Sequence, residues 1–354
     1  MDRPAKDGRH LADLVLMAIP LCKAAQAKVI RRGPGRPPVY EEWQIAMLIF
    51  VAILQRRKSK SSQWNFLSQH QPLLMEVLQL TRFPTRSTYF ERYRRAWPVY
   101  EKAVELQGKK ALQEHVSRAR VIAVDKSLIA ARGPQWHKWD QKEGIIPPAT
   151  DTGAAWSRNG CKEWVFGYSY EVVVCATANC VVFPLLASVD QASRNEQRSV
   201  AGKIPLLPPS VRYGLFDGGY DNNQRAQEME YSHSGKRNGR RYVCPLQARC
   251  GNRAVGKAIQ KGKRERGRLR RLERHRFYNS KWGRALYARR KKTVEPFNQW
   301  FKNLFELQDQ VWHRGLENNR TMLLAAMFCY QLLLRYSFRN GRRNGQIQWI
   351  LDGL

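Results

Sequence analysis

Hydrophobic and polar positions change their pattern after about the first third of the chain, and the part before that change is typical of helices. An apolar stretch predicts a helix over 41–57, and a second helix is predicted over 62–80. Pro84 then breaks the chain, and Thr88 with Glu91 three residues later has the pattern of a capping box, which begins another helix. Three predicted helices thus precede the change of pattern.

The last of these helices is basic, which adds a possible function. A helix, a short break and a capped basic helix form the outline of a helix-turn-helix. Residues 1–115 are therefore predicted to be a helical DNA-binding domain, with simple packing of helices as the alternative. The arginines of the last helix that would contact DNA are Arg92, Arg94 and Arg95.

A basic stretch rich in Pro and Gly lies before these helices, over 31–38, and its composition predicts an extended backbone. Its Gly35-Arg36-Pro37 is similar to the core of minor-groove hooks, in which an arginine, here Arg36, enters the groove. A plain linker is the favoured alternative for this tripeptide.

Short runs rich in β-branched residues follow, and they alternate with helical stretches. Residues 120–125, 168–176, 181–189, 212–217 and 241–246 are predicted strands, and the second and third of them form a hairpin. Helices are predicted over 191–203, 222–231, 293–307 and 319–335. This order matches an α/β, ribonuclease-H-like fold, a mixed five-stranded sheet with helices on both faces. We expect that domain to span 116–340, with a tail over 341–354.

Composition changes the picture through its charge. Lys and Arg number 62 against 29 for Asp and Glu, a formal net charge of +33 over 354 residues. A polyanion is the natural partner of such a chain, with nucleic acid the first candidate, an anionic membrane surface the second and a generally basic surface without a partner the third. About half of the excess lies in 247–292, which holds 18 basic residues and two acidic ones, Glu265 and Glu273.

That basic insertion over 247–292 is too dense in charge for all of its cations to pair internally. We interpret it as a surface that follows DNA phosphates rather than only as a solvated face. The cations expected to contact DNA are Lys263, Arg264, Arg270 and Arg271.

The longest apolar runs, over 45–54 and 322–334, are shorter than the roughly 20 residues that a membrane span needs. The N-terminus also lacks the pattern of a signal peptide, so we expect a cytoplasmic protein with no membrane contact. The seven cysteines form no CxxC pair and no zinc-binding spacing with histidine. We expect them to be buried thiols.

Three acidic residues follow or precede predicted elements in a way that suits metal chemistry. Asp125 ends the first predicted strand, and Asp217 ends the fourth, before two glycines that allow a tight turn. Glu295 precedes Pro296, which is tolerated only in the first helical turn, so Glu295 should lie at a helix start. If that helix extends far enough, Lys291 and Lys302 share its face. Carboxylates from separate elements suit two Mg²⁺ or Mn²⁺ ions that act on a phosphodiester.

Each of these residues also has an ordinary structural interpretation, and two further candidates compete. A lone Asp after a strand is often a turn residue, and a Glu in a first helical turn often only stabilises the helix dipole. Asp221 is a competing candidate for the second carboxylate. His137 with Asp140 could form a catalytic dyad, but a Trp-rich loop that stacks on a base or packs on the sheet is favoured.

Four stretches together resemble the transposases of bacterial insertion sequences. Residues 122–127 (Ile-Ala-Val-Asp-Lys-Ser) are similar to their first Asp motif, and 216–221 (Phe-Asp-Gly-Gly-Tyr-Asp) to their second. Residues 290–297 with Lys302 resemble the third motif, and 156–170 resembles the segment that enters the second strand. The resemblance covers about 85–335.

The third motif of one large group of these families is Tyr, two residues, Arg, three residues, Glu, six residues, Lys. Glu295 and Lys302 fit that spacing. The Arg position holds Lys291, with Arg290 one place off, and the Tyr position holds Ala288, with Tyr287 one place off. The Glu/Lys half is thus matched and the Tyr/Arg half is shifted, which puts the subfamily in doubt.

The resemblance implies a DDE transposase, a metal-dependent endonuclease and strand-transferase that cleaves the ends of an insertion sequence and joins the 3′ ends to target DNA. Asp125, Asp217 and Glu295 would bind two Mg²⁺ or Mn²⁺, and Lys302, with Lys291 or Arg290, would contact phosphate. The partners would be double-stranded DNA and, on DNA, a second copy of the chain, in the bacterial cytoplasm at the nucleoid. The alternatives are a catalytically inactive DNA-binding derivative and a ribonuclease-H-like nuclease without strand transfer.

Overall fold

The computed structural model describes residues 9–29, 38–160, 162–232, 234–246, 266–308 and 310–353. Helices precede the sheet, as predicted. The predicted helix over 62–80 is in fact two helices, because Pro72 in the first turn of the second one lacks the N–H that a continuous helix would need. The helices of this part are α1 (Arg9–Val29), α2 (Glu42–Leu54), α3 (Lys60–Gln69), α4 (Gln71–Leu78), α5 (Arg86–Tyr93) and α6 (Trp97–Gln113).

The capping box predicted at Thr88 and Glu91 is wrong, because α5 begins earlier. Thr85 follows Pro84 in an extended conformation, and its hydroxyl accepts a hydrogen bond from the backbone N–H of Thr88 at 3.3 Å. Thr85 is therefore the N-cap, and Thr88 already lies in the first turn. Glu91 instead pairs with Arg95, at 3.0 Å.

The sheet contains β1 (Val121–Ala130), β2 (Ala155–Arg158), β3 (Trp164–Cys175), β4 (Pro184–Gln191), β5 (Tyr213–Phe216) and β6 (Arg241–Val243). It is mixed: β1 pairs antiparallel with β3 and parallel with β5, and β5 pairs parallel with β6. On its other edge β3 pairs with β2 and then with β4. The predicted mixed five-stranded sheet is confirmed, with the four-residue β2 as an addition.

The first strand is longer than predicted. It was expected to end at Asp125 but continues to Ala130, because antiparallel pairing with β3 holds it as far as Ala130 opposite Gly167. Gly167 leaves no room for a side chain beside β1: a Cβ there would lie 2.1 Å from the carbonyl oxygen of Ile129. The parallel partner β5 ends earlier, at Phe216 opposite Val124. Asp125 is thus the first residue beyond the parallel pair.

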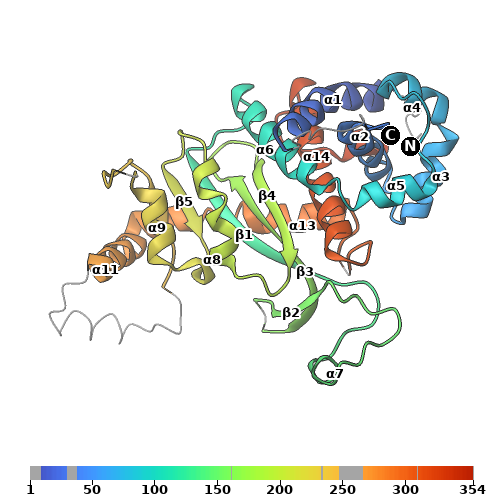
Figure 1. Ribbon diagram of the computed structural model, residues 1–354. Helices are drawn as coiled ribbons and strands as arrows, with labels where there is room; N and C mark the ends of the chain where they lie inside the picture. Colours follow the sequence, from blue (N-terminus) through green and yellow to red (C-terminus); the bar gives the residue numbers. More distant parts are fainter. Residues whose placement is uncertain are drawn as a thin grey trace, which may run out of the picture.

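Helices cover the sheet (Figure 1). In the described part of the chain, those that follow β1 are α7 (Lys138–Glu143), α8 (Glu196–Ala201), α9 (Asn223–Glu230), α11 (Arg266–Asn279), α12 (Lys281–Tyr287), α13 (Val294–Leu304), α14 (Leu316–Arg339) and α15 (Gln348–Asp352). Short 3-10 turns η1 (Ile204–Leu206) and η2 (Gly218–Tyr220) flank β5. The four helices predicted over 191–203, 222–231, 293–307 and 319–335 are confirmed. They are α8, α9, α13 and α14.

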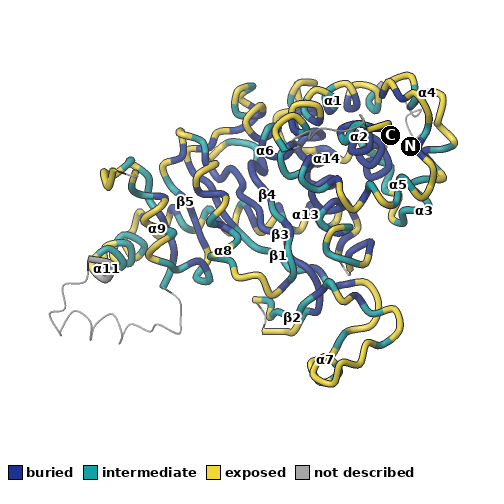
Figure 2. Tube along the Cα trace, in the orientation of Figure 1, coloured by how far each residue is buried: buried dark blue, intermediate teal, exposed yellow. Residues whose placement is uncertain are grey.

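The helix α14 is the centre of the hydrophobic core. It packs against α6, α2, α1 and β4, and Figure 2 shows it buried among them. The apolar residues of the N-terminal helices and of the sheet form one continuous cluster. The proposed boundary between residues 115 and 116 stays a prediction.

By length and composition α1 and α14 could each cross a membrane, which is weak evidence because core helices pass the same test. The apolar window of α14 is 94% buried inside the protein, and α1 buries one face, with Leu14, Ala18 and Cys22, in the shared core. Among the five cysteines in the described part of the chain, all are free thiols and Cys180 alone is not fully buried, close to what was expected.

Candidate active site

The strand register brings Asp125 and Asp217 to one edge of the sheet. Val124 of β1 lies beside Phe216 of β5, so the next residue of each chain segment is an aspartate. Asp217 is exposed and precedes the turn η2, and Asp125 is largely buried, with 17% of its side chain exposed. The carboxyl ends of parallel strands thus meet here, as predicted, although β1 itself continues past the site.

Glu295 lies in the first turn of α13, followed by Pro296, so the predicted helix start is confirmed. Thr293 is the residue before the helix, and 52% of the Glu295 side chain is exposed. Lys291 lies in the preceding turn, so the helical spacing that would place it on the face of Glu295 and Lys302 does not apply. The carboxylate of Glu295 thus lies at the surface, at the start of α13.

The buried guanidinium of Arg290 lies between two of the three carboxylates. It pairs with Oδ1 of Asp125, and its other terminal nitrogen is 3.8 Å from Oε1 of Glu295. The residue is 8% exposed. A cation therefore already lies where these two acidic side chains converge.

The pKa of Asp125 is affected by both of the other acidic residues and by Arg290. The pKa of Asp125 is raised to about 6: burial raises it most, Arg290 lowers it, and the carboxylates of Asp217 and Glu295 raise it. The same two neighbours, with Asp125, raise the pKa of Arg290 against its burial. Asp217 and Glu295 thus lie close enough to Asp125 to affect its pKa, although the three residues come from three separate elements.

The second oxygen of Asp125 is held by a residue that the sequence did not single out. The side-chain amide of Asn298, on α13, donates to Oδ2 of Asp125 at 2.9 Å. The hydroxyl of Tyr170, on β3, donates in turn to Oδ1 of Asn298, also at 2.9 Å. Asn298 follows Glu295 by three residues, which places both on one face of the helix. That spacing was the only signal in the sequence.

Lys302 lies on the same helix and reaches β1. Its ammonium group donates to the carbonyl oxygen of Leu128 at 2.9 Å, and burial lowers its pKa. It is thus a partly buried cation along the strand that carries Asp125. Any contact with phosphate remains a proposal.

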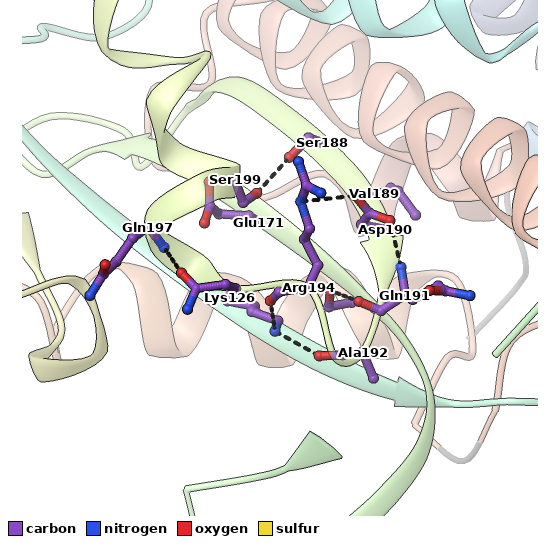
Figure 3. A network of polar contacts seen from close by, with 12 residues as sticks. Lys126, Glu171, Ser188, Val189, Asp190, Gln191, Ala192, Arg194, Gln197 and Ser199 are labelled. Carbon is purple, nitrogen blue, oxygen red and sulfur yellow. Dashed lines mark hydrogen bonds and ion pairs between the residues drawn. The ribbon is translucent and has the colours of Figure 1, made fainter. Parts of the chain in front are cut away.

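The opposite face of β1 is closed by a polar network. Successive residues of a strand point to opposite faces, and Lys126 donates to the carbonyl oxygens of Ala192 and Arg194 at 2.7 Å each (Figure 3). A further carboxylate, Glu196, lies beside Gly219: a Cβ on that glycine would be 1.8 Å from Oε2. Burial raises the pKa of Glu196, and Lys126 lowers it. Sequence reasoning missed Glu196.

The competing candidates have other surroundings. Asp221 pairs with Arg271 of α11, and 6% of its side chain is exposed. His137 precedes α7, at the tip of an arm that extends away from the sheet (Figure 1). The indole of Trp156, on β2, donates to the carbonyl oxygen of Trp136, in this loop, at 2.7 Å. The loop is thus held against the sheet at β2, and packing on the sheet was one of the two favoured interpretations.

Apart from Arg271, Arg290 and Lys302, whose contacts are given above, the cations predicted to bind DNA fall into three groups. Arg92 is held internally, by Glu42 at 2.6 Å and by the carbonyl oxygen of Tyr40, so it serves packing of the helices. Exposed or partly exposed cations include Arg94, Arg95, Lys291 and Arg270, whose guanidinium lies over the ring of Tyr231. Arg36, Lys263 and Arg264 lie outside the described residues.

The three acidic side chains offer the carboxylate oxygens that a hard divalent cation prefers as ligands. Asp125, Asp217 and Glu295 supply oxygen ligands from three elements, and the guanidinium of Arg290 shows that the space between two of them accepts positive charge. Over the ranges that the structure describes, no three Asp, Glu, His or Cys side chains are gathered closely enough to hold a metal ion together. Binding would therefore require movement of the exposed Glu295 or of Arg290.

Comparison with known proteins gives one result that bears on this site. The family model described as "Transposase DDE domain" matches residues 117–332, which includes all three carboxylates. Neither the comparison with curated proteins nor the comparison with solved structures gives a match.

Proposed function

Because the chain belongs to the transposase DDE domain family, we propose that it cleaves the ends of an insertion sequence and joins the 3′ ends to target DNA. The family implies transposase activity, DNA as a partner and the use of divalent metal ions. The observation that carries the finer proposal is the meeting of Asp125 and Asp217 at the sheet edge, with Arg290 between Asp125 and Glu295.

In this proposal Asp125, Asp217 and Glu295 hold two Mg²⁺ or Mn²⁺ ions. Such ions activate a water molecule or a 3′-hydroxyl and stabilise the leaving oxygen of a phosphodiester. The chain's own contribution is to present carboxylates from β1, the turn after β5 and the start of α13 on a scaffold whose strands are buried.

Arg290 and Lys302 would contact the phosphate near the cut. A guanidinium binds carboxylate and phosphate through the same paired N–H geometry, so DNA can replace Asp125 as the partner of Arg290. Lys291 is exposed one residue away and is the alternative contact. This proposal therefore gives Arg290 two partners, a carboxylate without DNA and a phosphate with it.

The remaining contacts with double-stranded DNA would come from the basic insertion over 247–292, from Arg94 and Arg95, and from Arg36. Synapsis of two element ends requires more than one active site, so we propose a homodimer on DNA. The proposed location is the bacterial cytoplasm, at the nucleoid.

The direct test uses DNA duplexes made from the genomic sequence that flanks the coding region, incubated with the purified protein and Mg²⁺. We expect nicking at defined ends and products joined to target DNA, both lost in Asp217→Asn. Asp140→Asn is the matched control and should keep wild-type activity, which would also exclude the His137/Asp140 dyad. DNA binding without nicking would support the inactive derivative, and nicking without joined products would support a nuclease. Equal nicking by wild type and Asp217→Asn would refute the triad.

A further inference from the structure

The two carboxylate oxygens of Asp125 have different partners. Oδ2 accepts a hydrogen bond from the side-chain amide of Asn298 at 2.9 Å, and Oδ1 pairs with the guanidinium of Arg290. One oxygen thus faces a neutral donor on α13, and the other faces the cation that lies toward Glu295.

The amide of Asn298 can face Asp125 in one orientation only. Tyr170 donates its hydroxyl to Oδ1 of Asn298, which leaves the NH₂ group directed at Asp125. The opposite orientation would place the amide oxygen against the Asp125 carboxylate, so that two acceptors would face each other. Tyr170 is 1% exposed, and its ring packs on Phe301 of α13 at 5.2 Å between centroids, so this hydroxyl is itself fixed.

We infer that Asn298 and Tyr170 are positioning residues that fix the rotation of the Asp125 carboxylate, so that Oδ1 is the oxygen available to a cation. The inference rests on the proposed metal-dependent function and deepens it. In the structure the cation at Oδ1 is Arg290. When a divalent ion is bound, Oδ1 would be the oxygen of Asp125 that it takes.

The physical reason is that an aspartate has two rotatable side-chain bonds, and neighbouring carboxylates push it away from the site. Asp217 follows the residue that lies beside Val124, and Glu295 lies across Arg290 from Asp125, so both bring like charge toward the Asp125 carboxylate. A hydrogen bond to Oδ2 from the side away from Arg290 opposes that rotation without adding charge. Residues that orient a metal ligand in this way typically change metal affinity by about 10- to 100-fold when they are replaced.

The experiment measures Mn²⁺ binding to the full chain without DNA, with free Mn²⁺ followed by electron paramagnetic resonance. Asn298→Leu keeps the side-chain size but has no donor, and Tyr170→Phe removes only the hydroxyl. Gln299→Ala is the control, because Gln299 is the next residue of the same helix and its amide bonds only to Asn303 among the contacts described. Asp125→Asn is the reference for loss of the ligand.

We expect Asn298→Leu to raise the Kd for Mn²⁺ by about 10- to 100-fold and Tyr170→Phe by about 2- to 10-fold, with Gln299→Ala at the wild-type value. Thermal unfolding without metal and DNA binding without metal should change little in Tyr170→Phe, which separates positioning from folding. If Asp125→Asn weakens Mn²⁺ binding while both Asn298→Leu and Tyr170→Phe leave it unchanged, the inference is wrong and the proposed function stands. If Asp125→Asn itself binds Mn²⁺ like wild type, the metal site of the proposed function is wrong.

Discussion

Replacing Arg290 by alanine should destabilise the metal-free protein at neutral pH and much less at pH 5.5. In the structure the buried guanidinium of Arg290 neutralises the largely buried carboxylate of Asp125. Its second contact, with the half-exposed Glu295 at 3.8 Å, is screened by solvent and contributes little. The effect therefore depends almost entirely on the charge state of Asp125.

The size of the effect follows from that charge state. Removing one partner of a buried ion pair typically costs about 3–5 kcal/mol. Protonation of Asp125 removes its charge and therefore limits this cost. At pH 7.5, about 1.5 units above the Asp125 pKa of about 6, protonating the carboxylate itself costs about 2 kcal/mol. We therefore expect a loss of about 2–3 kcal/mol at pH 7.5. At pH 5.5 most Asp125 is already protonated in the parent, and about 1 kcal/mol from the lost hydrogen bonding remains.

The assay is urea unfolding followed by tryptophan fluorescence, in EDTA, at both pH values. Lys291→Ala is the control: it removes an exposed cation one residue away, at the position where the motif spacing alone would place the arginine. Its effect should stay within about 0.5 kcal/mol at both pH values. An equal loss for Arg290→Ala at pH 7.5 and pH 5.5 would show that the Asp125 charge is not what Arg290 stabilises. An effect of Lys291→Ala as large as that of Arg290→Ala would show that the pairing of Arg290 with Asp125 is wrong.

Three other predictions follow from the same contacts. Because a protonated carboxyl cannot bind a metal, Mn²⁺ affinity should fall up to about tenfold per pH unit below the Asp125 pKa of about 6, and a flat titration from pH 7.5 to pH 5 would contradict this. Gly167→Ala should lower unfolding free energy by about 2–3 kcal/mol, measured by urea unfolding, because its Cβ would meet strand backbone at 2.1 Å. Although burial raises the pKa of Glu114, Arg335 and Arg339 lower it to about 2, so this carboxylate stabilises the fold above its ordinary pKa of 4.5 and loses that effect as pH falls toward 2. Glu114→Gln should thus cost about 3 kcal/mol at pH 7 and little at pH 2 in pH-dependent melting, and an equal loss at both would refute the pairing.

The order of strands and helices could be predicted because each element carries its own local pattern. The runs that became β1, β3, β4 and β5 are β-branched and flanked by turn residues. The short β2 was missed because its four residues, Ala-Trp-Ser-Arg, have no such pattern and are a strand only through pairing with β3. The length of β1 was missed for the same reason: nothing between Asp125 and Ala130 shows that β3 continues alongside.

The residues of the candidate site also fall into those with a local sequence signal and those whose position depends on long-range packing. Asp217 and Glu295 follow from a turn and a proline, which are local signals, and the structure places both as expected. The roles of Asn298 and Tyr170 depend on α13 lying against β1 and β3, which no spacing in the sequence specifies. Glu196 belongs to this second group as well, since its place beside Gly219 depends on α8 packing against η2.

The shifted half of the third motif has a structural explanation. Tyr287 and Arg290 keep the spacing of Tyr, two residues, Arg, and the extra residue lies between Arg290 and Glu295. In a continuous helix one added residue would rotate Arg290 by about 100° away from Glu295. Here α12 ends at Tyr287 and α13 begins at Val294, and the residues between them form a series of tight turns. An added residue changes such a turn without rotating either helix, and in this arrangement Arg290 reaches Asp125 although the spacing to Glu295 is one residue longer.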